Sequence, residues 1–419
     1  MENKPPMQGQ GSDTLEALEE IRKHGHFLEV LGVFTRLGLT SFGGPVAHLG
    51  YFRDEIVIRR KWVDERTYGD LLGLCQFLPG PASSQTGISL GIMRAGLAGG
   101  LAAWLGFTLP SAVLMTLFAY STGMLHSAIA AGALHGLMVV AVAVVAQAVW
   151  GMARTLCPDR PRATMAILAA IITLLLPAGI VQVAIIFVAG LFGWLMFKNM
   201  GTTSAPKPLT LHVSIPRALA IACLTLFAVL LVLFLLPGIF LQLHALALFG
   251  SFYRSGALVF GGGHVVLPLL QAAVVAPGWV NNGQFLAGYG AAQAVPGPLF
   301  TFAAYLGAIE KPAPNGWLGA TIALLGIYLP SFLLLVGVLP FWNSLRNLTA
   351  FQAALRGINA AVVGLLLAAL YQPIWTSSIK NANDFLLALA AFGLLVLWKV
   401  PPWLVVLLAA LAGAVISLL

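Results

Sequence analysis

Two arginines stand at matching positions of a duplicated apolar sequence. Arg36 lies within residues 34–45 (FTR…SFGGP) and Arg254 within 252–263 (FYR…VFGGG), and each precedes a Gly-Gly pair by the same spacing. A charge within an apolar segment costs roughly 2.5–3.5 kcal/mol on insertion scales, so such residues are functional candidates. Two forked guanidinium groups would suit a tetrahedral oxyanion. The alternatives are that each arginine pairs with a carboxylate, such as Glu29 near Arg36, or reaches the membrane interface.

A second duplicated motif, Gln-x-x-Pro-Gly-Pro, interrupts both halves of the chain. Proline suits the start of a new helix because its missing N–H needs no partner there, and the free N–H groups of such a start bind anions. The alternative is that glycine and proline only kink helices for packing, which is common in membranes. Because the whole motif is duplicated, we favour a substrate site. We expect contacts from both pairs of breaks: Ser41, Gly43, Gly44, Gln76, Pro79, Gly80, Pro81, Ser83 and Ser84 in the first half, and Gly261, Gly262, Gln293, Pro296, Gly297, Pro298 and Thr301 in the second.

Two histidines adjoin the Gly-Gly pairs. His48 and His264 are not at matching positions of the duplication. Histidine titrates near neutral pH, so both are candidates for coupling transport to protons. The alternative, which is the commoner role, is a hydrogen-bonded histidine that serves packing.

The composition predicts a polytopic helical membrane protein. Hydrophobic residues make up 59% of the 419 residues and charged residues only 9%, against about 25% charged residues in a soluble chain. Apolar runs such as 96–120, 132–152 and 216–236 reach the length of about 20 residues that a spanning helix needs. In lipid, backbone groups must be paired internally, which favours helices over open sheet. The net charge of +8 lies in short loops between spans, which indicates membrane orientation and not a nucleic-acid partner.

Other function classes lack their residues. The three cysteines, Cys75, Cys157 and Cys223, have neither CxxC nor metal-ligand spacing, so we expect no metal, redox or disulfide role. The sequence has no P-loop, HExxH or dinucleotide motif. We therefore expect no enzyme and no cofactor, with energy taken from ion or substrate gradients. The first 26 residues are polar, without the apolar core of a signal peptide.

The sequence divides into five segments. These are a cytoplasmic N-terminal segment (1–26), a transporter repeat (27–198), a linker (199–215), an unpaired span (216–237) and a second repeat (238–419). Each repeat is expected to hold two broken hairpins and four spans. In the first repeat the hairpins cover 27–52 and 70–93, and the spans about 96–120, 126–152, 163–176 and 179–197. In the second the hairpins cover about 242–270 and 285–309, and the spans about 316–339, 348–371, 383–398 and 401–418.

The second repeat is predicted to be inverted. One unpaired span between two equal repeats places the second upside down in the membrane. The basic loop 53–66 corresponds to 271–284, which holds no lysine or arginine, as expected for a loop that now faces outward. Inverted repeats with discontinuous helices point to a substrate site near the midplane. The duplication also includes Leu-Pro-Ser at 109–111 and 329–331.

These motifs resemble one family. Residues 41–45 (SFGGP), 60–63 (RKWV) and 76–81 (QFLPGP), repeated in the second half, are similar to the chromate ion transporter (CHR) family in its long, two-domain form, over about 30–419. The resemblance implies a multi-pass inner-membrane protein of bacteria or archaea, with a cytoplasmic N-terminus, that exports chromate and confers chromate resistance. Sulfate is implied as a competitor. Gly263 replaces the proline of the first Gly-Gly-Pro, and Leu299-Phe300 replaces Ala82-Ser83, so we expect unequal half-sites.

We therefore expect a secondary oxyanion exporter that works by alternating access. Chromate would bind between the repeats, with its two charges balanced by Arg36 and Arg254. Three alternatives stay open: an uptake carrier for sulfate or a related anion, a passive anion channel, and a membrane enzyme that reduces chromate. The enzyme would need an electron carrier, for which the sequence offers no ligand set. Glycine pairs at four-residue spacing, such as Gly87 with Gly91, indicate close helix packing. Exposed small-residue faces permit a homodimer, although monomers have them too.

Overall fold

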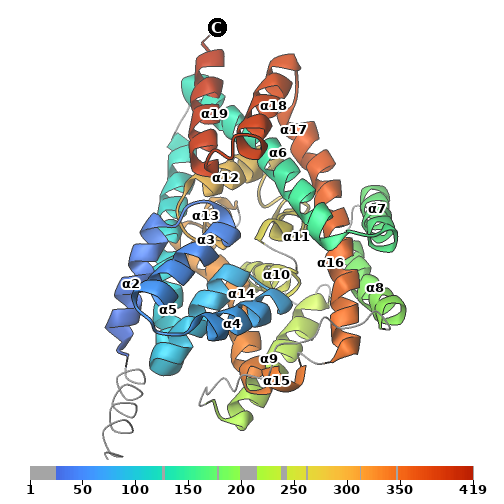
Figure 1. Cartoon of the computed structure of the whole chain (residues 1–419). Helices are drawn as coiled ribbons and strands as arrows, with labels where there is room; N and C mark the ends of the chain where they lie inside the picture. The colour runs from blue at the N-terminus through green and yellow to red at the C-terminus, as the bar shows by residue number, and fades with distance from the viewer. Residues whose placement is uncertain are drawn as a thin grey trace, which may run out of the picture.

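The structure is helical throughout the part of the chain that it describes. The computed structural model describes residues 25–124, 128–176, 179–198, 215–236, 243–260, 263–311, 313–345 and 348–418 (Figure 1). Six of its helices are long and apolar enough to cross a membrane. The predicted all-helical, polytopic membrane fold is thus confirmed, while the inverted orientation and the re-entrant course of the broken helices stay predictions.

The first half contains both predicted breaks. Helix α2 (Phe27–Thr40) stops before the glycine pair, and α3 (Gly44–Phe52) follows it and runs into the π-helical turn η1 (Arg53–Arg59). Helix α4 (Glu65–Phe77) stops at Pro-Gly-Pro, and α5 (Ala82–Met124) starts directly after it. Gly43 and Gly80 have φ angles of 99° and 125°, which glycine adopts without a Cβ penalty. Helix α5 is interrupted again at Ala95 and Gly96.

The second half repeats this order after the unpaired α9 (Arg217–Leu235). Helix α10 (His244–Ala257) precedes the Gly-Gly pair, and η2 (Gly263–Val265) and α11 (Val266–Val274) follow it. Gly261 and Gly262 lie outside the described residues. Helix α12 (Asn282–Ala294) ends at the second Pro-Gly-Pro, followed by η3 (Leu299–Thr301), α13 (Phe302–Ile309) and the long α14 (Gly316–Val338).

The last helices of each half pack on the other half. The first half ends with α6 (Ala128–Leu156), α7 (Arg160–Leu175) and α8 (Gly179–Phe197). The second ends with η4 (Leu339–Phe341), α15 (Trp342–Leu345), α16 (Thr349–Ala369), η5 (Leu370–Trp375), α17 (Thr376–Ser378), α18 (Ala382–Val396) and α19 (Pro402–Ile416). Helix α16 packs against α7 and α8, and α6 packs against α18 and α19. The two halves are therefore intertwined and do not form separate domains.

Small residues make these exchanged contacts close. Gly357 of α16 faces the backbone of Ala189 and Gly193 on α8, and Gly136 of α6 faces the backbone of Ala409 on α19. Glycine allows such an approach because no side chain separates the two helix backbones.

Gly357→Val is expected to lower thermal stability, because an added Cβ would overlap the carbonyl oxygen of Ala189. Overpacking of this kind costs about 1–3 kcal/mol. The control is Gly151→Val on α6, where nothing lies within 4 Å of an added Cβ. Thermal unfolding of both variants in detergent makes the comparison, and an equal Tm for the two would contradict the exchanged packing.

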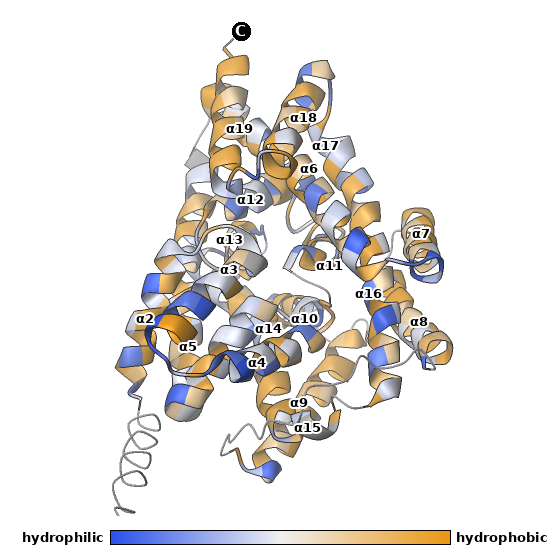
Figure 2. Cartoon of the chain, in the orientation of Figure 1, coloured by the Kyte–Doolittle hydropathy of each residue, from blue (hydrophilic) through white to orange (hydrophobic). Residues whose placement is uncertain are grey.

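The outer surface is apolar, as a membrane protein requires. Only 11% of the apolar window of α9 is buried within the chain, so its leucines and valines are left to face lipid. Figure 2 shows α8, α9 and α19 as mainly hydrophobic, with hydrophilic residues gathered around α3 and α4. The largest cluster of buried apolar residues joins α10–α14 to parts of α5, α6 and α16. It contains the broken helices of the second half, and a separate cluster contains those of the first half.

Candidate functional site

The four breaks meet through two reciprocal backbone hydrogen bonds. The Gly80 N–H donates to the carbonyl oxygen of Val259 at 2.7 Å, and the Gly297 N–H donates to that of Ser41 at 2.9 Å. Ser41 and Val259 each stand two residues before a Gly-Gly pair. Each Pro-Gly-Pro turn is thus held by the Gly-Gly break of the other half. We call the region around Ser41, Gly80, Val259 and Gly297 the crossing.

Two serines complete the crossing. A Cβ added to Gly80 would overlap the hydroxyl of Ser331, and a Cβ added to Gly297 would lie 2.8 Å from the hydroxyl of Ser111. Each serine belongs to the duplicated Leu-Pro-Ser, and each contacts the glycine of the other half. Sequence reasoning identified that duplication but did not assign it to the site.

Several buried polar atoms at the crossing have no hydrogen-bond partner among the described residues. The Gln85 Nε2 donates to Pro79 O at 2.8 Å, but its Oε1 is unpaired, and the hydroxyl of Tyr328 lies beside those of Ser84 and Thr108. Each unmet group costs about 1–3 kcal/mol, so such a cluster indicates a place where water or a polar ligand binds. The unpaired atoms are Ser41 Oγ, Gln85 Oε1 and Ser331 Oγ, whereas the hydroxyls of Ser84, Thr108 and Tyr328 are close enough to interact with one another.

The predicted break residues do not all face this cluster. Ser83, Ser84 and Thr301 are buried, although the Thr301 hydroxyl donates to the carbonyl of its own turn, at Pro298, at 2.8 Å. Gln293 is half-buried with its amide nitrogen unpaired. Gln76 and Gly43 are exposed, Gly44, Pro296 and Gly297 are half-buried, and Pro79, Gly80, Pro81 and Pro298 are buried.

The two histidines occupy different surroundings. His48 is 1% exposed, and its Nδ1 lies 3.5 Å from the Ser83 hydroxyl at the crossing, while Nε2 is unpaired. His264 Nδ1 lies 2.7 Å from the hydroxyl of Tyr289. His48 therefore belongs to the crossing, and a role in proton coupling stays a prediction for both.

The two arginines do not share a site in this structure. Arg36 is exposed on α2, because the buried residues of that helix, such as Phe34 and Leu37, lie on the side that packs against α5. Arg254 is half-buried, because α10 is enclosed on most sides by α9, α11 and α14. Figure 1 shows α2 at the outer edge and α10 in the middle of the molecule. The equivalence of the two positions in sequence does not extend to their environment.

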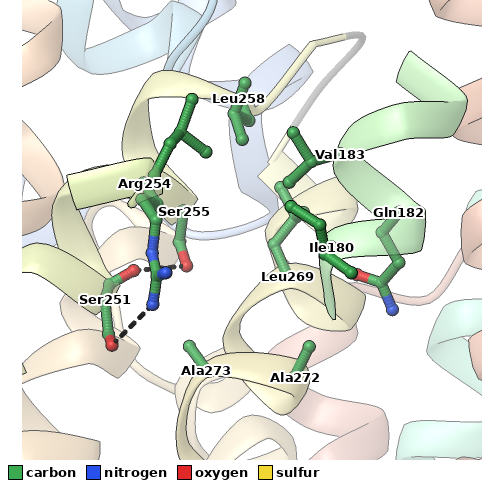
Figure 3. Close-up of a pocket in the computed structure, with 11 residues that line it drawn as sticks. Ile180, Gln182, Val183, Ser251, Arg254, Ser255, Leu258, Leu269, Ala272 and Ala273 are labelled. Atoms are coloured by element: carbon green, nitrogen blue, oxygen red, sulfur yellow. Dashed lines mark hydrogen bonds between the residues drawn. The ribbon is translucent and has the colours of Figure 1, made fainter. Parts of the chain in front are cut away.

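Arg254 lines a pocket of about 290 Å³ between the two halves (Figure 3). Its Nη2 donates to the Ser251 hydroxyl at 3.1 Å, and no carboxylate pairs with it among the described residues. Helices α10 and α11 form one side, and the first turn of α8 forms the other. The lining residues are Ile180, Gln182, Val183, Leu235, Ser251, Arg254, Ser255, Leu258, Leu269, Ala272 and Ala273.

Polar side chains line one part of an otherwise apolar pocket. Gln182 is 7% exposed, and its Oε1 has no partner in the described part of the chain. Rotation of its amide would turn the NH₂ donor toward the pocket. The N-terminus of α8 adds a partial positive charge. Leu258 lines the pocket and adjoins Val259 of the crossing, so the two places are neighbours along the chain.

Comparison with known proteins identifies the same duplication. The family model described as "Chromate transporter" matches residues 28–194 and again 246–414. A "Chromate transport protein" of Pseudomonas aeruginosa is 30% identical over 80% of this chain and 77% of its own length. One of Cupriavidus metallidurans with the same description is 26% identical, with 87% of each chain covered. No solved structure matches.

One relative corresponds to half of this chain. An "Uncharacterized transporter" of Bacillus subtilis is 28% identical over 40% of this chain, which spans 95% of that protein. A single repeat is therefore the length of a whole protein in that relative. This agrees with the two separate matches to the family model.

Proposed function

Because the chain belongs to the chromate transporter family, we propose that it is a secondary transporter that exports chromate from the cytoplasm and confers chromate resistance. It is a multi-pass membrane protein and a member of a transporter family, not of an enzyme family. We further propose an inner-membrane location with a cytoplasmic N-terminus, which the basic loop at 53–66 supports.

The observation that carries the substrate assignment is the pocket of Arg254. It combines a cation that has no carboxylate partner among the described residues, the hydroxyls of Ser251 and Ser255, and the buried amide of Gln182. A water molecule occupies about 30 Å³ in the liquid, so about 290 Å³ holds a tetrahedral oxyanion and several waters. One guanidinium balances one of the two charges of chromate, and the hydroxyl donors with the α8 N-terminus stabilise the other.

The crossing supplies the second part of the proposed mechanism. Its unpaired hydroxyls provide polar partners along a path between the halves. One backbone hydrogen bond holds each Pro-Gly-Pro turn to the other half. In this proposal the turns shift at the crossing while the exchanged packing of α6 and α16 stays intact. In this proposal the anion enters at Arg254 and passes the crossing as access alternates. The break residues remain proposed substrate contacts. The proposal assigns the anion to Arg254, and the predicted pairing of Arg36 with Arg254 is the alternative that an Arg36 variant tests.

Two alternatives differ in direction or coupling. A sulfate uptake carrier would use the same pocket, since sulfate is also a tetrahedral dianion. A passive anion channel would show flux that ignores an imposed pH gradient. No specific contact in the structure favours either alternative over the exporter.

Flux in proteoliposomes tests the proposal. We expect entrapped labelled chromate to exchange across the membrane, sulfate to inhibit that exchange by competing for the pocket, and an imposed pH gradient to drive net movement. The control is liposomes without protein. Sulfate flux without chromate flux would overturn the substrate, and chromate flux insensitive to the gradient would overturn secondary active transport.

A further inference from the structure

A buried carboxyl group meets a histidine where α10 begins and α13 ends. Glu310 lies in the connection between α13 and α14 and is 2% exposed, and its Oε2 lies 3.2 Å from Nε2 of His244. Neither carboxyl oxygen completes a hydrogen bond within the described residues. Burial raises the pKa of Glu310 to about 8. We call the contact of Glu310 with His244 the second joint.

The second joint is isolated from other charges. Trp279 packs edge-on against His244, with 4.7 Å between ring centroids. The backbone carbonyl of Trp279 accepts the Lys311 N–H at 3.2 Å, and the Lys311 side chain is exposed. Among the arginines on the elements packed around α10 and α13, Arg94 pairs with Glu29, Arg254 donates to Ser251, and Arg217 of α9 is exposed. None of the tyrosines on these elements is bonded to Glu310: Tyr120, Tyr253, Tyr289, Tyr305 and Tyr328.

The first half contains the matching joint. His26 and His244 stand at the same distance before the two duplicated arginines. Arg94 and Glu310 follow their Pro-Gly-Pro motifs at distances that differ by one residue. In both halves, therefore, the start of the helix before the Gly-Gly break meets the end of the helix after Pro-Gly-Pro.

Different chemistry closes the two joints. In the first half Arg94 Nη2 lies 3.2 Å from Glu29 Oε2, and the Gly25 N–H donates to Arg94 O at 3.2 Å. The basic partner of this joint is a guanidinium, which is not deprotonated in proteins. In the second half an imidazole takes the place of the guanidinium as the basic partner. The basic partner of the second joint can therefore gain and lose a proton, whereas that of the first cannot.

We propose that Glu310 and His244 form a proton-binding site that controls the second joint and couples oxyanion movement to a pH gradient. The inference rests on the proposed transport function. With one proton between them the two side chains are neutral overall, and the joint is closed. Loss of that proton leaves a buried anion and gain of a second leaves a buried cation, and each state favours hydration and opening of the joint.

The second joint is connected to both parts of the proposed substrate path. Helix α10, which begins at His244, carries Arg254 and Ser251 into the pocket. Helix α13, which ends before Glu310, follows the Pro-Gly-Pro turn whose Gly297 bonds to Ser41 at the crossing. Opening at this point would move the start of α10 relative to α13, so proton exchange can alter access to the pocket.

The test uses full-length variants in proteoliposomes and separates chromate exchange at equal pH from accumulation driven by a pH gradient. A gradient of one pH unit drives about tenfold accumulation for each proton coupled to one chromate. We expect Glu310→Gln and His244→Arg to keep exchange but to lose gradient-driven accumulation. The control is Asp384→Asn. Asp384 also meets a histidine, with Oδ1 2.8 Å from His135 Nε2, but it also accepts the Lys380 N–H at 2.9 Å, so this variant should keep both activities.

Infrared spectroscopy of the purified protein gives a readout that does not need chromate. The band of a protonated carboxyl group is expected at neutral pH in the unmodified protein, and it should be absent from Glu310→Gln and present in Asp384→Asn. Gradient-driven accumulation that survives in Glu310→Gln, or a band that this substitution leaves unchanged, would overturn the proton site. Absence of chromate exchange in the unmodified protein, with the Glu310 band present, would reject the substrate and support the proton site.

Discussion

Arg254→Gln is expected to abolish chromate transport while the protein still inserts and folds. The substitution removes the one charged side chain among the described residues that line the pocket, whereas glutamine, although shorter, keeps a neutral polar side chain there. Loss of one partner from a desolvated charge pair costs about 2–5 kcal/mol, which is roughly 30-fold to several thousand-fold in affinity. Chromate exchange in proteoliposomes, measured over a range of chromate concentrations, should show this loss.

Arg36→Gln provides the matched control, because both arginines hold the same position in the duplicated sequence. Arg36 is exposed on α2, and exposed substitutions usually change free energies by no more than about 0.5 kcal/mol, or about twofold. Arg254→Lys should recover part of the activity, since it restores the charge but not the forked donor geometry. Equal losses for the Arg36 and Arg254 variants would reject the pocket and restore the symmetric pair of arginines.

Gly80→Ala is expected to disrupt the crossing and remove transport. Gly80 has a φ angle of 125°, and an added Cβ would overlap the Ser331 hydroxyl and approach the Gln85 amide to 2.6 Å. Backbone strain of this kind costs on the order of 1–3 kcal/mol before any overlap is counted. Because the Gly80 N–H bonds to Val259 of the other half, the strain falls on a contact between the repeats. Thermal unfolding and chromate exchange should therefore both decrease.

Gly297→Ala should give a similar but smaller effect, because its added Cβ would lie 2.8 Å from the Ser111 hydroxyl, at a φ angle of 98°. The control is Gly32→Ala, since an added Cβ there meets nothing within 4 Å and alanine favours the helix by about 1 kcal/mol. If either Pro-Gly-Pro variant retained both full stability and full exchange, the crossing would not be the contact that holds the repeats together.

Much of the fold could be predicted from local pattern. Six predicted spans, α9 among them, and the breaks at Gly43-Gly44 and at both Pro-Gly-Pro motifs agree with the helix bounds. The predicted spans 163–176, 383–398 and 401–418 correspond to α7, α18 and α19, which have only 16, 15 and 15 residues. The agreement has a physical basis, because lipid requires long apolar helices and because the adjacent glycines and prolines of the duplicated motifs interrupt them. Single prolines such as Pro110 and Pro330 lie inside α5 and α14 without ending them. The proline prediction needs a small adjustment: Pro81 accepts the first helical N–H, from Gln85 at 2.9 Å, so α5 begins just after it.

Contacts between distant residues could not be predicted in this way. The reciprocal bonds of Gly80 with Val259 and of Gly297 with Ser41 join residues from opposite halves. Neither hydropathy nor residue spacing determines how far apart these residues lie in the folded chain. The same holds for Ser111 and Ser331, whose duplication was visible although their approach to the glycines was not. The pairing of Glu310 with His244 likewise depends on two helix ends that are distant in sequence.

The sequence alone determined that this is a duplicated, helical membrane protein of the chromate transporter family, because apolar length, helix breaks and repeated motifs are local properties of the chain. Only the tertiary structure decided which arginine lines a pocket. Arg36 and Arg254 have the same spacing to their glycines, but α2 lies at the edge of the molecule and α10 is enclosed by other helices. The burial of a residue depends on the residues packed around it. Because the two halves pack differently, equivalent positions have different neighbours.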